Sequence, residues 1–439
     1  MTANARMNVS GEIRVPGDKS ISHRALLLAA LGCGPSRIRG ILDSADVRST
    51  AGALRMLGVD VPPLGSDIIV EGVGAGGFRS PADSLDCGNS GTTARLLAGI
   101  VAGSPIVARF VGDASLSRRP MRRVAEPLEA MGARFEFERA EGLPMTVHGG
   151  RLRGIRWVNE TSSAQVKGAI LLAGVAAGVE VSVTERWPSR DHTERMLAAR
   201  GVSVGISSDG VTIRRRDPLP AADTDVPSDP SSAAFFAALG ALAWSGELTI
   251  RDVGVNETRI GFLHALEEMG ARIRFEAVRE LGGEPVADIV VQPGALRALE
   301  IGEARVPTLI DELPLLACVA ARAEGVTRIS GARELRVKES DRIAAVVANL
   351  RAVGAAAEEL PDGMIITGSD TPLAGRVTTH GDHRLAMAFG VLGALPGNRI
   401  VIDAPDCVAV SFPTFWQTLE RARGGVSAGS RTPGAAARG

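Results

Sequence analysis

The sequence is poor in the residues on which several classes of protein depend. Its 439 residues include no tyrosine, and aromatic residues make up only 3%. Proteins that bind single-stranded nucleic acid stack bases on aromatic side chains, so this composition argues against that class. The six histidines are scattered, and the four cysteines form no CxxC pair. We therefore expect reduced thiols, with neither a metal site nor a disulfide framework.

Net charge and long apolar runs are also limited. The formal net charge is −1, which argues against a protein that coats nucleic acid. The N-terminal segment lacks the apolar core of a signal peptide, and the apolar stretch 233–244 is too short to span a bilayer. Hydrophobic residues make up 45% of the chain, as in ordinary globular proteins. We expect a soluble cytoplasmic protein of two or three domains, with a disordered tail over residues 424–439.

Two short patterns recur along the chain. One is the end of an amphipathic helix followed by a glycine and a strand, and it occurs at residues 54–61, 128–137, 197–204, 266–275 and 350–359. The other is an alanine-rich helix that is apolar on nearly all sides, as expected of a buried helix. Its copies cover residues 22–32, 91–103, 163–178, 231–244, 311–325 and 383–397. Together the patterns indicate six units of about 70 residues each.

The alternation of helices and strands predicts an α/β fold in which helices cover sheets. Six units are too many residues to share a single hydrophobic core, so we predict two lobes of three units each. Polar segments rich in proline mark the boundaries. The first lobe then comprises residues 1–16 and 228–423, and the second lobe comprises residues 17–227. The sixth unit lacks closing strands, and we expect the strand near residues 8–16 to join it.

The starts of the buried helices are polar, and several of them carry cations. Lys19 and Arg24 lie in the first turns of a helix that we expect Ser20 to cap. The start of a helix already carries partial positive charge, so these cations would be repelled unless an anion joined them. A nucleotide-binding P-loop is disfavoured, because Asp18 separates Gly17 from Lys19. The pattern indicates a negatively charged ligand, and we expect a phosphorylated one.

Five motifs in order along the chain point to a known family. They are PGDKSISHRALLLAAL at 16–31, GNSGTTARLL at 88–97, SAQVKGAILLAG at 163–174, RVKESDRI at 336–343 and GDHRLAMAF at 381–389. Together they resemble the 5-enolpyruvylshikimate-3-phosphate synthase (3-phosphoshikimate 1-carboxyvinyltransferase) family of enolpyruvyl transferases, over roughly residues 7–422. The resemblance implies two lobes, each of three βαβαββ units that include the buried helices.

The same resemblance implies a reaction. The enolpyruvyl group of phosphoenolpyruvate would pass to the 5-hydroxyl of shikimate 3-phosphate, with release of phosphate. Such a transferase belongs to the shikimate pathway, in which chorismate and the aromatic amino acids are made. The family uses no metal or organic cofactor, so none is expected here.

The resemblance also implies roles for individual residues. Asp311 would be the general base at the 5-hydroxyl, Glu339 would handle the methylene proton, and Lys19 could pass a proton. How these three groups share the proton transfers stays open. The residues implied to hold shikimate 3-phosphate are Lys19, Ser20, Arg24, Ser163, Ala164, Gln165 and Lys338, and those implied to hold phosphoenolpyruvate are Lys19, Gly91, Arg119, Arg342 and Arg384.

The sequence departs from the family pattern in a few places. Val410 stands where many members have a lysine, and Glu334 stands where some have an asparagine. In the segment that follows Pro188, either Ser189 or Arg190 contacts the substrate. These departures concern minor contacts and leave the main set of cations intact.

Two other functions remain as alternatives at this point. The sister family, UDP-N-acetylglucosamine enolpyruvyl transferase, shares the fold and the donor, but it typically has Lys-Asn where this chain has Lys19-Ser20. A non-catalytic phosphate-binding module is the second alternative, and the joint presence of Lys19, Asp311 and Glu339 argues against it. We expect small-molecule substrates, no nucleic acid or membrane partner, and a monomer.

Overall fold

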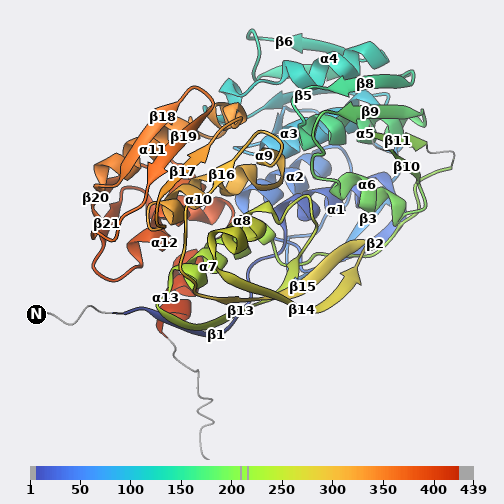
Figure 1. Cartoon of the computed structure of the whole chain (residues 1–439). Helices are drawn as coiled ribbons and strands as arrows, with labels where there is room; N and C mark the ends of the chain where they lie inside the picture. The colour runs from blue at the N-terminus through green and yellow to red at the C-terminus, as the bar shows by residue number, and fades with distance from the viewer. Residues whose placement is uncertain (1–5, 208–209, 215–216, 425–439) are drawn as a thin grey trace, which may run out of the picture.

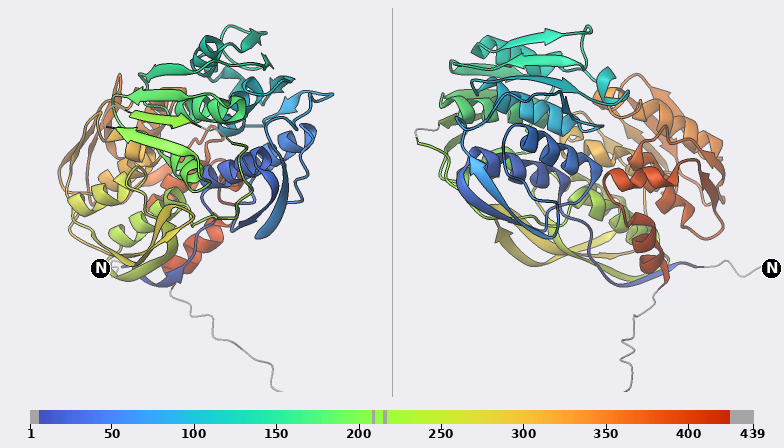
Figure 2. Two further views of the ribbon diagram at one scale, coloured as in Figure 1. Left: turned by 90° about the vertical axis from the view of Figure 1, so that its right-hand side faces the viewer. Right: turned by 180° about the vertical axis from the view of Figure 1, so that it is seen from behind.

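The computed structural model describes residues 6–207, 210–214 and 217–424. In this part of the chain, one hydrophobic core is built from residues 7–15 and 233–422, and another from residues 21–226. We call the elements around these cores the first and the second lobe. Figures 1 and 2 show the second lobe in blue to green and most of the first lobe in yellow-green to red, with the blue strand β1 beside β13 in the first lobe.

The ends of the chain are described only in part. Of the tail predicted to be disordered, Gly424 is the last residue of helix α13, and residues 425–439 lie outside the described residues. Among the described residues, no helix is long and apolar enough to cross a membrane.

The second lobe contains three units of similar order within the described residues. The first unit contains α1 (Lys19–Leu31), β2 (Cys33–Arg39), α2 (Ala45–Met56) and β3 (Asp67–Val73), with β12 (Thr224–Asp225) added from the end of the lobe. The second unit contains β4 (Leu85–Asp86), α3 (Gly91–Ala102), β5 (Val107–Val111), η1 (Leu116–Arg118), α4 (Arg122–Met131), β6 (Arg134–Phe137) and β7 (Met145–His148). The third unit contains β8 (Ile155–Asn159), α5 (Ala164–Ala177), β9 (Val181–Glu185), α6 (His192–Ala198), β10 (Ser203–Ser207) and β11 (Gly210–Arg214).

The first lobe contains three further units in the described chain, of which the fourth and fifth repeat this order and the sixth lacks the two closing strands. The fourth unit contains α7 (Pro230–Leu242), β13 (Ser245–Gly254), α8 (Gly261–Met269), β14 (Arg272–Leu281) and β15 (Glu284–Gln292), with β1 (Asn8–Ile13) added from the start of the chain. The fifth unit contains β16 (Glu300–Ile301), α9 (Val306–Leu309), η2 (Ile310–Glu312), α10 (Leu313–Ala320), β17 (Val326–Ile329), η3 (Arg333–Val337), α11 (Arg342–Ala352), β18 (Ala356–Leu360) and β19 (Gly363–Thr367). The sixth unit contains β20 (Ala374–Val377), α12 (His383–Gly393), β21 (Arg399–Ile402), η4 (Pro405–Val410) and α13 (Phe415–Gly424).

The alanine-rich helices are buried, as their apolar composition predicts. In α1, every residue from Ile21 to Leu31 is buried, and α7 is buried over almost its whole length. Small residues let these helices approach one another closely. A Cβ atom on Gly99 of α3 would lie only 2.2 Å from the carbonyl oxygen of Ala169 in α5, so this contact requires glycine.

The N-terminal strand pairs differently from the prediction. Strand β1 runs parallel to β13, with Asn8 opposite Ser245, and completes the sheet of the fourth unit in the order β1-β13-β15-β14. The expectation that it joins the sixth unit is therefore wrong. Helix α13 of the sixth unit packs against β1. Local sequence could not decide this, because β1 reaches its partner across more than 200 residues.

The two connections between the lobes run side by side. The amide of Asp18 donates to the carbonyl of Pro227 at 2.8 Å, and the amide of Asp229 donates to the carbonyl of Pro16 at 2.9 Å. Asp18 caps α1 in the second lobe, and Asp229 caps α7 in the first lobe. The buried guanidinium of Arg259 donates to both carboxylates, at 2.9 and 3.2 Å. The starts of α1 and α7 are thus fixed relative to one another where the lobes meet.

Candidate functional site

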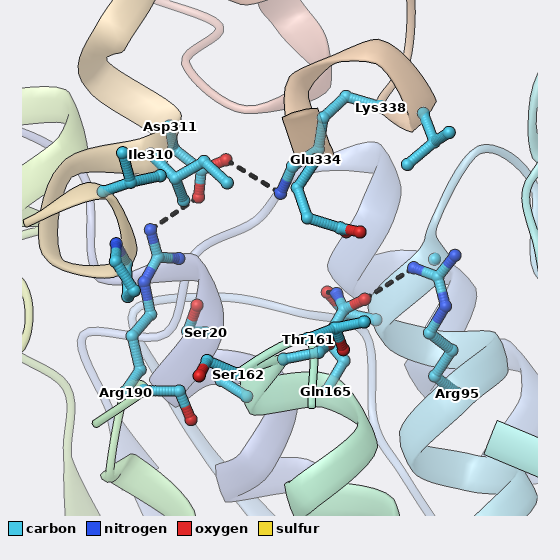
Figure 3. A pocket seen from close by; sticks show the side chains of 18 of the residues that line it. Ser20, Arg95, Thr161, Ser162, Gln165, Arg190, Ile310, Asp311, Glu334 and Lys338 are labelled. Carbon is cyan, nitrogen blue, oxygen red and sulfur yellow. Dashed lines mark hydrogen bonds and ion pairs between the residues drawn. The ribbon is translucent and has the colours of Figure 1, made fainter. Parts of the chain in front are cut away.

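A cavity of about 320 Å³ lies between the lobes, where the starts of the buried helices converge. Its wall includes residues at or next to the first turns of α1, α3, α5, α7, α10 and α12. Helix N-termini present free N–H groups and partial positive charge, so each of them favours an anion. The polar residues that open the buried helices therefore meet at one place. Figure 3 shows part of this wall.

The side chains of the cavity add to its positive potential. Among the described residues, ten lysine and arginine side chains line the cavity against seven carboxylate side chains, a formal excess of three positive charges. Six helix ends at about half a charge each contribute roughly three more. Two phosphorylated carboxylic acids would together bring about five to six negative charges. The charge of the cavity matches ligands of that kind.

Nearly all of the residues singled out from the sequence line this cavity. They are Lys19, Ser20, Arg24, Gly91, Arg119, Ser163, Ala164, Gln165, Asp311, Lys338, Glu339 and Arg384. Arg342 is the exception, because its side chain is only 1% exposed and is not part of the wall. It lies behind the wall and binds Asp382 at 2.8 Å, Glu339 at 2.6 Å and Asp311 at 3.5 Å.

The start of α1 is capped by a different residue from the one predicted. Asp18, not Ser20, accepts the hydrogen bond from the amide of Ile21, at 2.8 Å. Both residue types cap helices well, so the sequence alone could not choose between them. The ammonium of Lys19 lies 3.0 Å from Asp46 at the start of α2. These two carboxylates offset part of the positive charge at the start of α1, and Ser20 is left to face the cavity.

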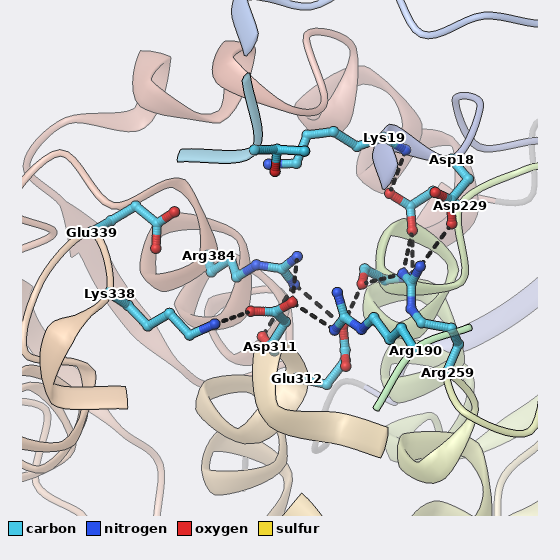
Figure 4. Close-up of polar contacts among 12 residues, drawn as sticks. Asp18, Lys19, Arg190, Asp229, Arg259, Asp311, Glu312, Lys338, Glu339 and Arg384 are labelled. Carbon is cyan, nitrogen blue, oxygen red and sulfur yellow. Dashed lines mark hydrogen bonds and ion pairs between the residues drawn. The ribbon is translucent and has the colours of Figure 1, made fainter. Parts of the chain in front are cut away.

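Asp311 is surrounded by cations (Figure 4). Its carboxylate lies 2.6 Å from Arg190, 3.5 Å from Lys338 and 3.9 Å from Arg384. Burial would raise the pKa of Asp311, but Lys338, Arg190, Arg384 and Arg342 outweigh burial and hold the pKa well below its ordinary value. Asp311 is therefore ionised at neutral pH in this arrangement.

Glu339 shares one of these cations with Asp311, because Arg342 contacts both carboxylates. It contacts Arg342 at 2.6 Å and Arg119, which belongs to the other lobe, at 3.4 Å. Burial would raise the pKa of Glu339, but Arg342 and Arg119 hold it well below its ordinary value. For Lys338 the effect of burial dominates, and it lowers the pKa although Asp311 raises it. The cluster thus combines two ionised carboxylates with an amine that loses its proton more readily than usual.

Some cavity residues were not assigned from the sequence. Arg95 is buried, donates to the Gln165 amide oxygen at 2.5 Å, and has an Nε atom without a partner among the described residues. Burial lowers its pKa to about 9. Arg123 binds Glu334 across the cleft at 2.7 Å. Arg95 lies within the motif at 88–97 and Arg123 lies outside the five motifs, and nothing in the local pattern showed that either side chain turns inward.

The structure also shows where the departures from the family pattern lie. The hydroxyl of Ser189 donates to Glu185, at 2.8 Å, whereas Arg190 extends across the cavity to Asp311. Val410 lies in η4 and is not part of the wall. Glu334 faces Arg123 at the edge of the cavity. No group of three or more histidine, cysteine, aspartate or glutamate side chains in the described chain could hold a metal ion.

Comparison with known proteins identifies the family. The profile of EPSP synthase (3-phosphoshikimate 1-carboxyvinyltransferase) matches residues 3–419. The chain belongs to the EPSP synthase family. A 3-phosphoshikimate 1-carboxyvinyltransferase of Persephonella marina is 47% identical over 419 residues, which are 94% of this chain and 97% of the relative. The enzyme of that name from Xanthomonas campestris pv. campestris is 48% identical over 422 residues, 96% of each chain.

Solved structures of this family have the same fold. EPSP synthase from Acinetobacter baumannii superposes with a TM-score of 0.83 at 40% identity, and the match covers 95% of this chain and 97% of that one. The chain therefore has the two-lobe α/β fold of the enolpyruvyl transferases, in agreement with the fold expected from the sequence.

Proposed function

We propose that this chain is an enolpyruvyl transferase of the shikimate pathway. It transfers the enolpyruvyl group of phosphoenolpyruvate to the 5-hydroxyl of shikimate 3-phosphate and releases phosphate. The observation that carries the proposal is the cavity, in which helix N-termini and cations of both lobes surround the carboxylate of Asp311. Membership of the EPSP synthase family supports the identity of the two substrates.

Asp311 is proposed to act as the general base. It is ionised in the present arrangement, but four cations make it a poor proton acceptor. Phosphate and carboxylate groups of bound substrates would share these cations, and the pKa of Asp311 would then rise. A base that gains strength only beside bound substrate suits proton removal from the 5-hydroxyl.

Glu339 and Lys19 are proposed to handle the second proton. The methylene carbon of phosphoenolpyruvate gains a proton and becomes a methyl group as the hydroxyl adds to C2. The resulting tetrahedral ketal then loses phosphate from C2 and a proton from that methyl group, which restores the carbon–carbon double bond. Glu339 lines the cavity next to Arg119 and shares Arg342 with Asp311. Lys19 is the first residue of α1, and its ammonium is proposed to protonate the departing phosphate.

The cations divide between the two substrates. For shikimate 3-phosphate we propose Lys19, Ser20, Arg24, Ser163, Ala164, Gln165 and Lys338, and for phosphoenolpyruvate we propose Lys19, Gly91, Arg119, Arg342 and Arg384, with Arg342 acting from behind the wall. Arg190 is proposed to replace Ser189 as the contact in its segment, since the hydroxyl of Ser189 already binds Glu185. Arginine grips planar phosphate and carboxylate groups in a bidentate manner, which suits these positions.

The proposal also covers the lobe boundaries, the cellular location and the oligomeric state. We propose that the lobes meet between residues 16 and 17 and between residues 227 and 228, where the two connections run side by side. We also propose a cytoplasmic monomer that requires no cofactor. The ion pairs Arg119–Glu339 and Arg123–Glu334 join the lobes at the cavity and favour the closed arrangement.

The experiment that tests the proposed reaction is identification of the product. Purified protein is incubated with phosphoenolpyruvate and either shikimate 3-phosphate or UDP-N-acetylglucosamine, and the mixture is followed by proton and phosphorus NMR. The proposal predicts new vinyl protons on an ether at the 5-oxygen of shikimate 3-phosphate and an equal amount of free phosphate. Reaction with UDP-N-acetylglucosamine instead would assign the chain to the sister activity.

A further inference from the structure

Glu185 lies at the end of strand β9, behind the wall of the cavity. Two loops that flank it, 160–163 before α5 and 186–191 before α6, contribute residues to that wall. Glu185 is not among the lining residues, and its side chain is only 6% exposed. Its carboxylate nevertheless binds Ser189 in the second loop directly and is joined to the first loop through Asn159, so Glu185 can affect the cavity without contacting a ligand.

One set of contacts fixes the second of these loops. The amide of Ser189 donates to Oε2 of Glu185 at 3.0 Å, and the hydroxyl of Ser189 donates to Oε1 at 2.8 Å. These bonds hold the hydroxyl of Ser189 on Glu185, although Ser189 still lines part of the cavity. The next residue, Arg190, extends from this fixed point and reaches Asp311 at 2.6 Å. The direction of Arg190 therefore depends on how Glu185 holds Ser189.

A second set of contacts fixes the first loop. The side-chain amide of Asn159 donates to Oε1 of Glu185 at 2.6 Å and to the carbonyl of Ser163 at 3.0 Å. Between them, Ser162 adopts a left-handed backbone with φ of 47°, a conformation that needs support from its surroundings. The hydroxyl of Ser162 accepts a hydrogen bond from the amide of Trp187 at 3.2 Å, which joins the two loops directly.

The charge of Glu185 is balanced within the protein. The buried ammonium of Lys167 lies 3.0 Å from Glu185 and 2.8 Å from Glu194. A single carboxylate thus accepts hydrogen bonds from Asn159, Lys167 and Ser189. Charged acceptors bind donors more strongly than neutral ones do, so this arrangement is stiff.

We propose that Glu185 is a positioning residue for shikimate 3-phosphate. The inference rests on the proposed function, in which Ser163 and Arg190 face that substrate. Figure 3 shows Ser162 and Arg190 on one wall of the cavity. The groups proposed for phosphoenolpyruvate, such as Arg119 and Arg384, belong to other elements. Loss of Glu185 should therefore weaken the binding of shikimate 3-phosphate more than that of phosphoenolpyruvate.

The test compares Glu185→Ala and Glu185→Gln with the wild-type chain. Trp187 lines the cavity within the affected loop, so tryptophan fluorescence can follow a titration with shikimate 3-phosphate in the absence of phosphoenolpyruvate. We expect the Kd and the KM for shikimate 3-phosphate to rise about tenfold in Glu185→Ala, the effect of one charged hydrogen bond. The increase should be smaller in Glu185→Gln, because an amide keeps one acceptor oxygen. The KM for phosphoenolpyruvate should change less than about twofold.

Glu180→Gln is the matched control. Glu180 immediately precedes the same strand and pairs with the exposed Arg214, so its loss should leave both KM values unchanged. If Glu185→Ala does not fold, Glu185→Gln decides, since Lys167 keeps Glu194 as a partner. An unchanged Kd in the Glu185 variants, or equal weakening of both substrates, would overturn the inference. A wild-type chain that neither binds nor converts shikimate 3-phosphate would overturn the proposed function as well.

Discussion

Replacement of Asp311 by asparagine separates catalysis from binding. The substitution keeps the shape of the side chain but removes the carboxylate that is proposed to accept the proton of the 5-hydroxyl. Arg384 and Lys338 lose a negative partner but keep another, because Glu312 still binds Arg384 at 3.3 Å and Glu339 stays close to Lys338. Arg190 loses the partner that it binds at 2.6 Å and becomes available to an anionic substrate. The cavity becomes more positive by one charge, and anionic substrates should bind as well as before or more tightly.

The expected magnitude follows from the role of a general base. Positioned bases contribute about 10²- to 10⁴-fold to rate, which corresponds to roughly 3–5 kcal/mol of transition-state free energy. We expect kcat of Asp311→Asn to fall within this range, while the Kd for shikimate 3-phosphate stays the same or falls. A role in binding alone would give the opposite pattern, a higher Kd with kcat nearly intact.

The assay measures phosphate release under saturating substrates, together with calorimetric titration of shikimate 3-phosphate. Asp370→Asn, in an exposed loop of the first lobe, is the control for the same chemical change outside the cavity. A kcat within tenfold of wild type, combined with weakened binding, would refute the assignment of Asp311 as the base.

Three further predictions concern other parts of the structure. The Arg123–Glu334 pair is partly exposed, so a double-mutant cycle with glutamine at both positions should give a coupling of about 1 kcal/mol, or fivefold in kcat/KM. Gly91→Ala would place a Cβ atom 2.7 Å from Nη1 of Arg95 and should raise the KM for phosphoenolpyruvate about fivefold. Burial would raise the pKa of Asp18, but Arg259, His192, the amide of Ile21 and Arg190 together outweigh burial and lower the pKa to about 2. Wild type should therefore lose about 2 kcal/mol of folding free energy between pH 4 and pH 2 that Asp18→Asn does not lose.

Each of these predictions has a clear contrary result. Additive effects of the two glutamine substitutions would mean that the cross-lobe pair does not contribute to catalysis. A larger increase in KM for shikimate 3-phosphate than for phosphoenolpyruvate would contradict the expected effect of Gly91→Ala. The depressed pKa of Asp18 stabilises the fold above the unfolded pKa and ceases to do so as pH falls toward 2. If the free energy of unfolding, measured with urea, fell equally in wild type and Asp18→Asn from pH 4 to pH 2, that contribution would be excluded.

The sequence predicted the interior of the protein well because the signal there is strong. Helices such as α1 and α7 are apolar on all sides, and no other environment suits such a surface. Their polar first turns then had to meet near one another, because each opens on the same side of its unit. The repeated order of helix and strand was sufficient to predict the two-lobe α/β fold.

Other features depend on contacts that local sequence does not contain. Asp18 and Ser20 are both good helix caps, and only the packing of the chain selects Asp18. The partner of β1 lies more than 200 residues away, so the expected pairing with the sixth unit was wrong. We infer that the inward direction of Arg190 depends on Ser189 and Glu185, and no sequence motif indicated this role of Glu185.

The most direct test of the account is the dependence of phosphate release on the two substrates. Purified wild-type protein is given phosphoenolpyruvate alone, shikimate 3-phosphate alone, and both together, and free phosphate is measured over time. We predict sustained phosphate release only when both compounds are present, and almost no release by the Asp311→Asn variant. Release from either compound alone, or none from the pair, would contradict the central claim that one basic cavity joins two phosphorylated acids for transfer.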